Sequence, residues 1–98
     1  MARALFRLPL LEHARVARQM AGLYEVTPDA HPILAESRAV KGLYIAGGFS
    51  GHGFMHSPGA GRVMSEIILD GASKTVDVSM LDLERFRENR LIVEQNVV

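Results

Sequence analysis

The sequence contains no cysteine and no tryptophan, and its 11 basic residues are balanced by 11 acidic ones. The absence of cysteine excludes disulfides and thiolate metal sites. It also fits a reducing compartment, so we expect a cytoplasmic protein. A chain without net charge lacks the positive field that attracts nucleic-acid phosphates, so we expect no nucleic-acid partner.

Long apolar runs are also missing. Arg7 and Pro9 interrupt the apolar N-terminus, which is too short for a membrane span or for the core of a signal peptide. Four arginines precede Met20, as in a transit peptide, but Glu12 counts against that interpretation. We therefore expect no membrane partner. A short helix over residues 2–12, broken near the proline, is expected to pack its apolar side chains on the body.

What the chain does contain is enough apolar residues, 48% of the total, to build a core in a domain of 98 residues. This composition is that of an ordinary globular protein and argues against disorder. A chain of this length buries roughly 60–68% of its unfolded surface, so the core is expected to be thin. We expect an α+β fold with a short N-terminal helix, few β-strands, a glycine-rich loop and one main C-terminal helix.

Patterns of apolar and turn-forming residues predict the strands. β-Branched and aromatic residues favour a strand over residues 15–25, and a second short strand begins at residues 33–34. Thr27–Pro32 separates them and has the proline and aspartate of a tight turn. After a loop over residues 37–42, the apolar run 43–46 is typical of a buried strand.

A main helix is expected over residues 55–69, with Gly71 at its C-terminal end. Proline is tolerated only in a first helical turn, so Pro58 predicts that the regular helix begins at His56 or Ser57. The expected buried face of this helix comprises Val63, Ile67 and Ile68.

The tail over residues 76–98 has one capping signal. Ser79 can cap a helical turn, with Asp82 three residues later. The charged stretch over residues 82–90 is interpreted as a solvated helix face. The remaining residues of the tail are expected to form an extended arm.

The segment that could form a functional site is a strand, a glycine-rich loop and a helix over residues 43–71. Its loop, Gly47–Gly53, has glycine at four of seven positions, which indicates positive φ values or close backbone approach. The free N–H groups of the following helix, with a dipole equivalent to about half a unit charge, attract anions. The glycines follow neither the Gly-x-Gly-x-x-Gly pattern nor a P-loop. From the pattern alone, an anion site and a tight strand-to-helix turn both remain open.

Histidine and tyrosine offer few further signals. His52 and His56 are four residues apart, but two ligands are too few for a metal and no His-Glu-x-x-His motif is present, so we expect none. Tyr24 and Tyr44 lie in predicted strands, where core packing with a hydrogen-bonded hydroxyl is the simplest role.

Two runs carry a resemblance to a known family. The run 42–58, Gly-Leu-Tyr-Ile-Ala-Gly-Gly-Phe-Ser-Gly-His-Gly-Phe-Met-His-Ser-Pro, resembles the C-terminal flavin loop of the D-amino-acid-oxidase-like family. The run 22–33, Gly-Leu-Tyr-Glu-Val-Thr-Pro-Asp-Ala-His-Pro-Ile, resembles the segment that leads into that loop. The order and spacing are also similar to the family's, and the resemblance covers about residues 15–71. Members include sarcosine oxidase, dimethylglycine dehydrogenase and the β subunit of dye-linked proline dehydrogenase.

The resemblance implies an enzyme that oxidises a C–N bond of a primary or secondary amine or amino acid to an imine, with hydride passing to FAD. It implies active-site positions for His52 and Tyr24. The implied cofactor-binding residues are Gly48, Phe49, Ser50, Gly51, His52, Gly53, Phe54 and Met55. Related monomeric sarcosine oxidases have a lysine at Met55 and a flavin-bonding cysteine at Gly22. We therefore expect FAD to be held non-covalently.

The resemblance further implies part of an FAD/NAD(P)-binding-type two-domain fold that lacks its N-terminal dinucleotide-binding unit. Residues 15–36 are interpreted as substrate-domain strands, 43–71 as the flavin segment and 76–98 as a tail. A partner chain or a second copy is expected to complete the site and to cover the strand over residues 43–46, which has no other strand of its sheet in the chain. The alternatives are a self-associating remnant without redox activity and an anion-binding module that uses residues 50–57.

Overall fold

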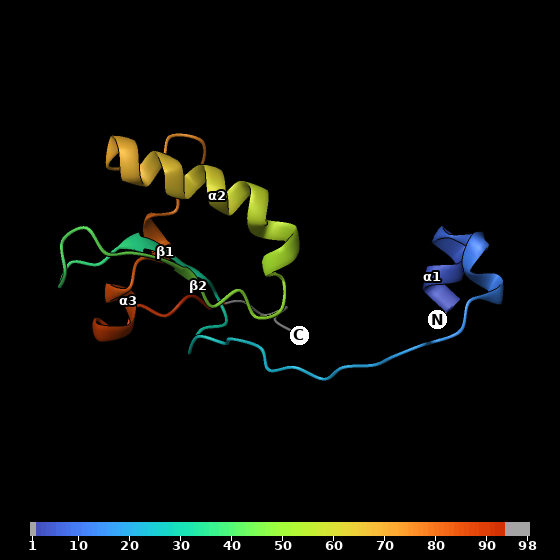
Figure 1. Ribbon diagram of the computed structural model, residues 1–98. Helices are drawn as coiled ribbons and strands as arrows, with labels where there is room; N and C mark the ends of the chain where they lie inside the picture. Colours follow the sequence, from blue (N-terminus) through green and yellow to red (C-terminus); the bar gives the residue numbers. More distant parts are fainter. Residues whose placement is uncertain (1, 94–98) are drawn as a thin grey trace.

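The computed structural model describes residues 2–93, so the end of the predicted arm, residues 94–98, lies outside the described part. The elements are α1 (Ala2–Arg7), the 3-10 helix η1 (Pro9–His13), β1 (Ile33–Glu36), β2 (Tyr44–Gly47), α2 (Gly53–Asp70), the 3-10 helix η2 (Ser79–Leu81) and α3 (Glu84–Arg87). Figure 1 shows α2 above the two strands and α3 below them. This arrangement confirms the predicted α+β class.

The two strands form an antiparallel pair. Ile33 lies opposite Gly47 at one end, and Glu36 lies opposite Tyr44 at the other. The two predicted short strands are therefore confirmed. The expectation that the strand over residues 43–46 has no strand partner in the chain is wrong, because the intervening loop folds it back on β1.

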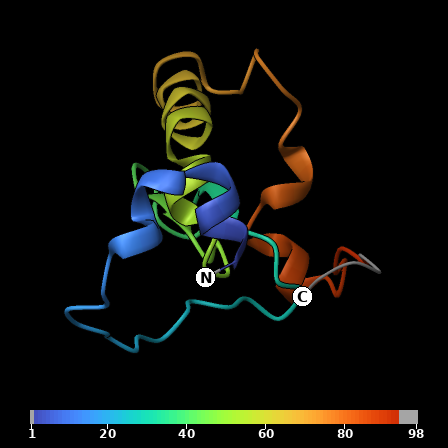
Figure 2. The ribbon, with the colours of Figure 1, turned by 90° about the vertical axis from the view of Figure 1, so that its right-hand side faces the viewer.

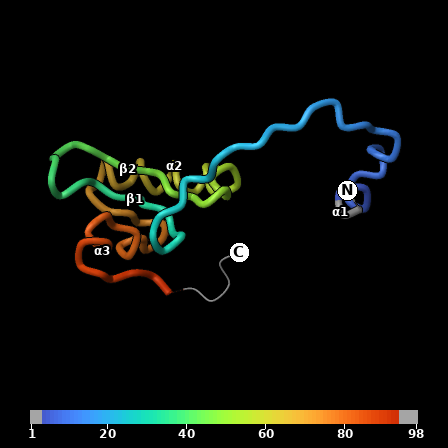
Figure 3. The backbone as a smooth tube through the Cα atoms, turned by 90° about the horizontal axis from the view of Figure 1, so that it is seen from below, coloured from blue at the N-terminus to red at the C-terminus, as the bar shows by residue number. Residues whose placement is uncertain are grey.

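The strand predicted over residues 15–25 is wrong. Residues 14–25 form neither helix nor strand, and their side chains are exposed. The first β pairing in this part of the chain is a bridge between Val26 and Phe49. A strand needs a neighbouring strand for its N–H and C=O groups, and within the described chain residues 14–25 pair with none. Figure 3 shows this segment as an extended connection.

The predicted N-terminal helix, broken at Pro9, is confirmed, but its packing on the body is wrong. Phe6 is 83% exposed and Leu10 is 89% exposed. Figures 1 and 3 show α1 and η1 together at the far end of the extended connection, which carries them away from the strands. The radius of gyration is consequently 17.6 Å, against about 13 Å for a compact domain of this length. No helix among residues 2–93 combines the length and apolar character needed to cross a membrane.

Helix α2 begins earlier than predicted, at Gly53 rather than at His56 or Ser57. Pro58 therefore lies inside the helix, where its missing N–H leaves the carbonyl of Phe54 without the usual donor. The Ser57 hydroxyl donates to that carbonyl at 2.8 Å. This side-chain bond explains why the proline does not delay the start of the helix.

The core lies between α2 and the strands and is thin, as expected. Val63 on α2 and Leu34 on β1 are the buried apolar residues of the described chain. The predicted buried face is confirmed for Val63, whereas Ile67 is half-buried and Ile68 is exposed. The predicted C-terminal end is also confirmed, because Gly71 has a φ of 81° and donates its N–H to the last helical turn.

The segment after α2 runs down one side of the molecule to η2 and α3 (Figure 2). Ser79 begins η2 rather than capping it, and its N–H donates to the Asp77 carboxylate at 2.9 Å. The interpretation of residues 82–90 as a solvated face is wrong at Arg85, which is fully buried. Arginine is buried when a carboxylate pairs with it, and here Asp29 is that partner.

Candidate functional site

The loop between β2 and α2 forms a tight turn over Phe49–His52. The N–H of His52 donates to the Phe49 carbonyl at 2.9 Å. Ser50 and Gly51 have φ values of 52° and 84°, which are those of the central residues of a type I′ turn. Glycine adopts this conformation freely, whereas serine is strained in it, so surrounding contacts must hold Ser50 in place.

The segment over residues 25–30 supplies those contacts. The Ser50 N–H donates to the Glu25 carbonyl at 3.0 Å, and the Ser50 hydroxyl donates to the Ala30 carbonyl at 3.0 Å. The carboxylate of Glu25 also accepts the Gly48 N–H at 3.4 Å. Glu25 and Ala30 therefore hold the turn through three hydrogen bonds.

Two glycines of the loop are required by close packing as well as by backbone conformation. A β-carbon at Gly51 would lie 2.6 Å from the ring of Tyr24, and one at Gly48 would overlap the methyl group of Thr27. Both glycines also have positive φ values. Tyr24 thus covers the turn with one face of its ring, yet it is 73% exposed and offers the rest to solvent.

A shallow pocket of about 220 Å³ lies beside this turn. It is lined by Leu23, Tyr24, Glu25, Phe49, Ser50, Gly51 and Gly53. Pockets that enclose a whole small ligand are larger, about 300–1,000 Å³. At this pocket the described residues therefore do not enclose a whole small ligand.

The structure brings most of the sequence-predicted site residues to this pocket. Five of them line it, namely Tyr24, Phe49, Ser50, Gly51 and Gly53. Gly48, His52, Phe54 and Met55 lie outside the lining. Phe54, at 97% exposed, extends an apolar surface along the first turn of α2. The nine predicted residues are thus neighbours, but they do not all face one cavity.

The N-terminus of α2 has no side-chain cap. His52 makes no side-chain capping hydrogen bond, and the first turn contains no acidic residue. An α-helix has no internal acceptor for the N–H groups of its first turn, which also carry the positive end of the dipole. This end of α2 therefore suits a negatively charged or hydrogen-bond-accepting group of a ligand.

The two histidines of this region are neighbours at the start of α2. The ring centres of His52 and His56 are 6.3 Å apart. Within residues 2–93, no group of three or more histidines and carboxylates is arranged to hold a metal ion.

The sequence analysis missed Asp29, which organises the turn behind the pocket. Its carboxylate accepts the N–H of His31 at 3.2 Å. The hydroxyl of Thr27 donates to the His31 carbonyl at 2.6 Å. The Thr-Pro-Asp pattern indicated a turn here, but it gave no sign that the carboxylate is buried.

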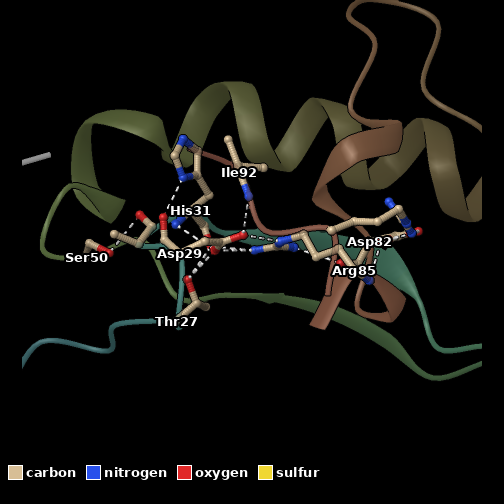
Figure 4. Close-up of polar contacts among 9 residues, drawn as sticks. Thr27, Asp29, His31, Ser50, Asp82, Arg85 and Ile92 are labelled. Carbon is tan, nitrogen blue, oxygen red and sulfur yellow. Dashed lines mark hydrogen bonds and ion pairs between the residues drawn. The ribbon is translucent and has the colours of Figure 1, made fainter. Parts of the chain in front are cut away.

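The partner of Asp29 is Arg85, and Figure 4 shows the guanidinium of Arg85 beside the carboxylate of Asp29. Nε and Nη2 of the arginine donate to the two carboxylate oxygens at 2.7 Å and 3.0 Å. The arginine and aspartate side chains are 0% and 1% exposed. This bidentate pair lowers the pKa of the Asp29 carboxyl well below its usual range, with further help from the N–H groups of His31 and Ile92. No sequence pattern links two residues that are 56 positions apart.

Comparison with known proteins gives this geometry a context. Residues 1–67 match the DAO family, described as FAD dependent oxidoreductase. Over 93 residues the chain is 38% identical to FAD-dependent oxidoreductase domain-containing protein 1 of Xenopus laevis, covering 94% of this chain and 19% of that protein. It is 32% identical over 86 residues to sarcosine oxidase subunit beta of Rhodobacter capsulatus, covering 88% of this chain and 20% of that protein.

A solved structure shows the same local fold. The chain is similar to the crystal structure of L-proline dehydrogenase from P. horikoshii, with a TM-score of 0.72 and 36% identity. This match covers 87% of this chain and 22% of that one. The chain therefore spans about a fifth of the length of these relatives.

Proposed function

The chain belongs to the DAO family of FAD dependent oxidoreductases, and from that premise we propose that residues 43–71 form one wall of an FAD site. The observation that carries this proposal is the open N-terminus of α2, directly after a turn with two residues of positive φ. Family membership supports flavin as the class of ligand that this wall contacts.

The residues present fit part of a flavin. The first turn of α2, Gly53–Met55, offers backbone N–H donors, and no carboxylate in that turn competes for them. Phe54 adds an exposed apolar side chain beside these donors. With no cysteine in the chain, the cofactor is held here without a thioether bond. The small pocket volume supports a site that a dinucleotide-binding unit outside these 98 residues completes.

The proposed reaction is oxidation of a small primary or secondary amine or amino acid. The chemistry that FAD supplies when bound is acceptance of the hydride lost as the C–N bond becomes an imine. Relatives named for sarcosine and for L-proline support this substrate class. With the flavin bound, the N-terminus of α2 would stabilise negative charge on it, Tyr24 would form part of the substrate wall, and His52, at the start of α2, would lie near the cofactor.

The proposal includes an assembly. A partner chain or a second copy supplies the dinucleotide-binding unit, and it covers the exposed apolar surface of residues 4–25. The proposed segmentation assigns residues 15–36 to the substrate domain, 43–71 to the flavin wall and 76–98 to a tail that supports it. The lack of cysteine supports a cytoplasmic setting.

Flavin retention tests the proposal. The 98-residue chain, alone and mixed with the dinucleotide-binding half of a relative, is dialysed against buffer after addition of FAD, and bound flavin is measured by visible absorbance. We expect retention in the mixture. If the chain adds no retention to that of the relative's half alone, residues 43–71 are not a flavin wall, and the redox-inactive remnant becomes the better description.

A pair of glycine variants makes this test specific. Gly51→Ala introduces both a strained φ and an overlap with Tyr24, so we expect about tenfold weaker retention, from a backbone cost of about 1–2 kcal/mol. Gly59→Ala is the matched control, because no atom lies within 4 Å of the added β-carbon. In the helix it should raise the free energy of unfolding by about 0.5–1 kcal/mol and leave flavin retention unchanged. Equal retention by both variants would contradict the proposed wall.

A further inference from the structure

We propose that Arg85 is a positioning residue for the loop over Gly47–Gly53, called here the flavin loop. It acts on this loop through Asp29, Ala30 and Ser50. The consequence for flavin binding rests on the function proposed above. The linkage itself lies within the described chain and can be tested without a cofactor. It connects the C-terminal tail to a loop more than 30 positions earlier in the sequence.

The first link is the guanidinium of Arg85, whose three nitrogens all donate. Besides its two bonds to Asp29, it donates from Nη2 to the His31 carbonyl at 2.8 Å and from Nη1 to the Asp82 carbonyl at 2.8 Å. One planar group therefore holds residues on both sides of Ala30 at once (Figure 4). A lysine has a single ammonium and cannot reproduce this fork.

The second link is the backbone of Ala30. Its φ is 58°, a left-handed conformation that costs a non-glycine residue about 1–2 kcal/mol. Its N–H donates to the Thr27 carbonyl at 3.0 Å, which closes the turn. Because Arg85 holds the Asp29 carboxylate and the His31 carbonyl, it fixes the direction of the Ala30 carbonyl between them.

The third link joins this turn to the flavin loop. The Ala30 carbonyl accepts the Ser50 hydroxyl at 3.0 Å. Ala30 and Ser50 are two of the three non-glycine residues with positive φ in the described chain, and they are hydrogen-bonded to one another. Two strained residues in direct contact stabilise one another only while the turn behind them stays in place. Arg85 supplies that support.

Amide hydrogen exchange in the full 98-residue chain tests the linkage. The reporters are the N–H of Ser50, which donates to the Glu25 carbonyl, and the N–H of His52, which donates to the Phe49 carbonyl. The N–H of Gly71, at the end of α2, serves as a distant reference. Arg85→Lys should accelerate exchange at the two loop reporters about threefold to tenfold, as expected for loss of one hydrogen bond, and should change Gly71 less. Arg87→Lys, at an exposed arginine of the same helix, is the matched control and should change neither.

A second variant tests whether Arg85 acts through the hydrogen bond between Ser50 and Ala30. Ser50→Ala removes only the bond to Ala30 and should accelerate the same two reporters. If Arg85 acts through this bond, the double variant exchanges no faster than the faster single variant, whereas independent effects multiply. Equal acceleration of Gly71 by Arg85→Lys, or multiplying effects, would overturn the proposal. If Arg85→Lys fails to fold, Ser50→Ala decides alone, because unchanged exchange at His52 would show that the bond does not hold the loop.

Flavin retention separates this inference from the proposed function. If the unmodified chain retains no flavin in any assembly, the proposed function fails, while the exchange rates still decide the linkage. If the unmodified assembly retains flavin and Arg85→Lys loosens the loop without weakening retention, the positioning role fails and the proposed function stands. Weaker retention with Arg85→Lys and with Ser50→Ala, but not with Arg87→Lys, supports both.

Discussion

Each side chain of the N-terminal segment, residues 4–25, is exposed, whereas the body, residues 26–93, buries several. In the segment, large apolar side chains such as Phe6 and Leu10 are exposed. In the body, the most deeply buried side chain is that of the charged Arg85, which is 0% exposed. Globular proteins usually bury apolar residues and expose charged ones. The comparison teaches that polar contacts organise the body, while the segment presents a surface that another part of an assembly is suited to cover.

A second carboxylate, that of Glu66, also holds the chain by polar contacts, just before the tail begins. Glu66 on α2 accepts the N–H groups of Lys74 and Thr75 at 2.7 Å and 3.0 Å. The Thr75 hydroxyl, these N–H groups and Arg62 lower the pKa of the Glu66 carboxyl. Glu66 therefore closes the chain after α2, as Asp29 anchors it near α3. With so thin an apolar core, these polar contacts decide the path of the tail.

The largest expected effect comes from removing the buried cation. Arg85→Ala leaves the Asp29 carboxylate buried without its partner, so the free energy of unfolding should fall by about 3–5 kcal/mol. That is a large part of the total for a small domain, about 5–15 kcal/mol. Urea unfolding followed by circular dichroism measures the change. The matched variant Arg87→Ala, at an exposed site, should change stability by less than about 0.5 kcal/mol. A similar small change for both would show that apolar packing, not the ion pair, holds the body together.

Acid should weaken the body through Asp29. Its pKa is lowered on folding, so its stabilisation is fully present above the unfolded value of about 3.9 and is lost as the pH falls below it. In that range the unfolded chain binds more protons, and one carboxylate contributes a slope of up to about 1.4 kcal/mol per pH unit. Urea unfolding at a series of pH values measures this slope. Glu66→Gln should remove only the share of the acid response that Glu66 contributes and retain the share from Asp29. Stability that stays constant through this range would contradict the assigned role of Asp29.

The smallest expected effect on the body comes from the N-terminal segment. The double variant Phe6→Ser, Leu10→Ser should leave the free energy of unfolding within about 0.5 kcal/mol, because neither side chain packs on the body. Self-association, measured by light scattering, should weaken about tenfold or more, since each apolar side chain covered in an interface contributes about 1.5–3 kcal/mol. Ala14→Ser is the control at another exposed position. Destabilisation of the body by the double variant would break the distinction between the two regions.

The sequence predicted those parts of the fold that depend on local chemistry. Proline and aspartate indicated the Thr27–Pro32 turn, and Gly71 indicated the end of α2. The glycines of the loop indicated positive φ values, which Gly48 and Gly51 have. These signals succeed because the conformational preference lies in the residue itself.

The errors concern features that depend on distant partners. The apolar pattern of residues 15–25 favours a strand, yet a strand forms only beside another one. Pro58 predicted a later helix start, because the Ser57 hydroxyl bond to Phe54 is not visible in a propensity. The assignment of Arg85 to a solvated face failed for the same reason, since only the folded chain brings Asp29 to it. The candidate site was predicted by family resemblance, whereas its supporting network required coordinates.

The separation of Asp29 from Arg85 also sets an order of events during synthesis. The two residues are 56 positions apart, so a ribosome releases the turn, the strands and α2 before the arginine that completes the turn has left it. Until then, the strained backbone at Ala30 and Ser50 lacks its final support, and contacts between distant positions are the slow ones to form. If Arg85 positions the loop over residues 47–53 as proposed, that loop reaches its final shape only when the tail arrives, and its completion is a late step in folding of the chain.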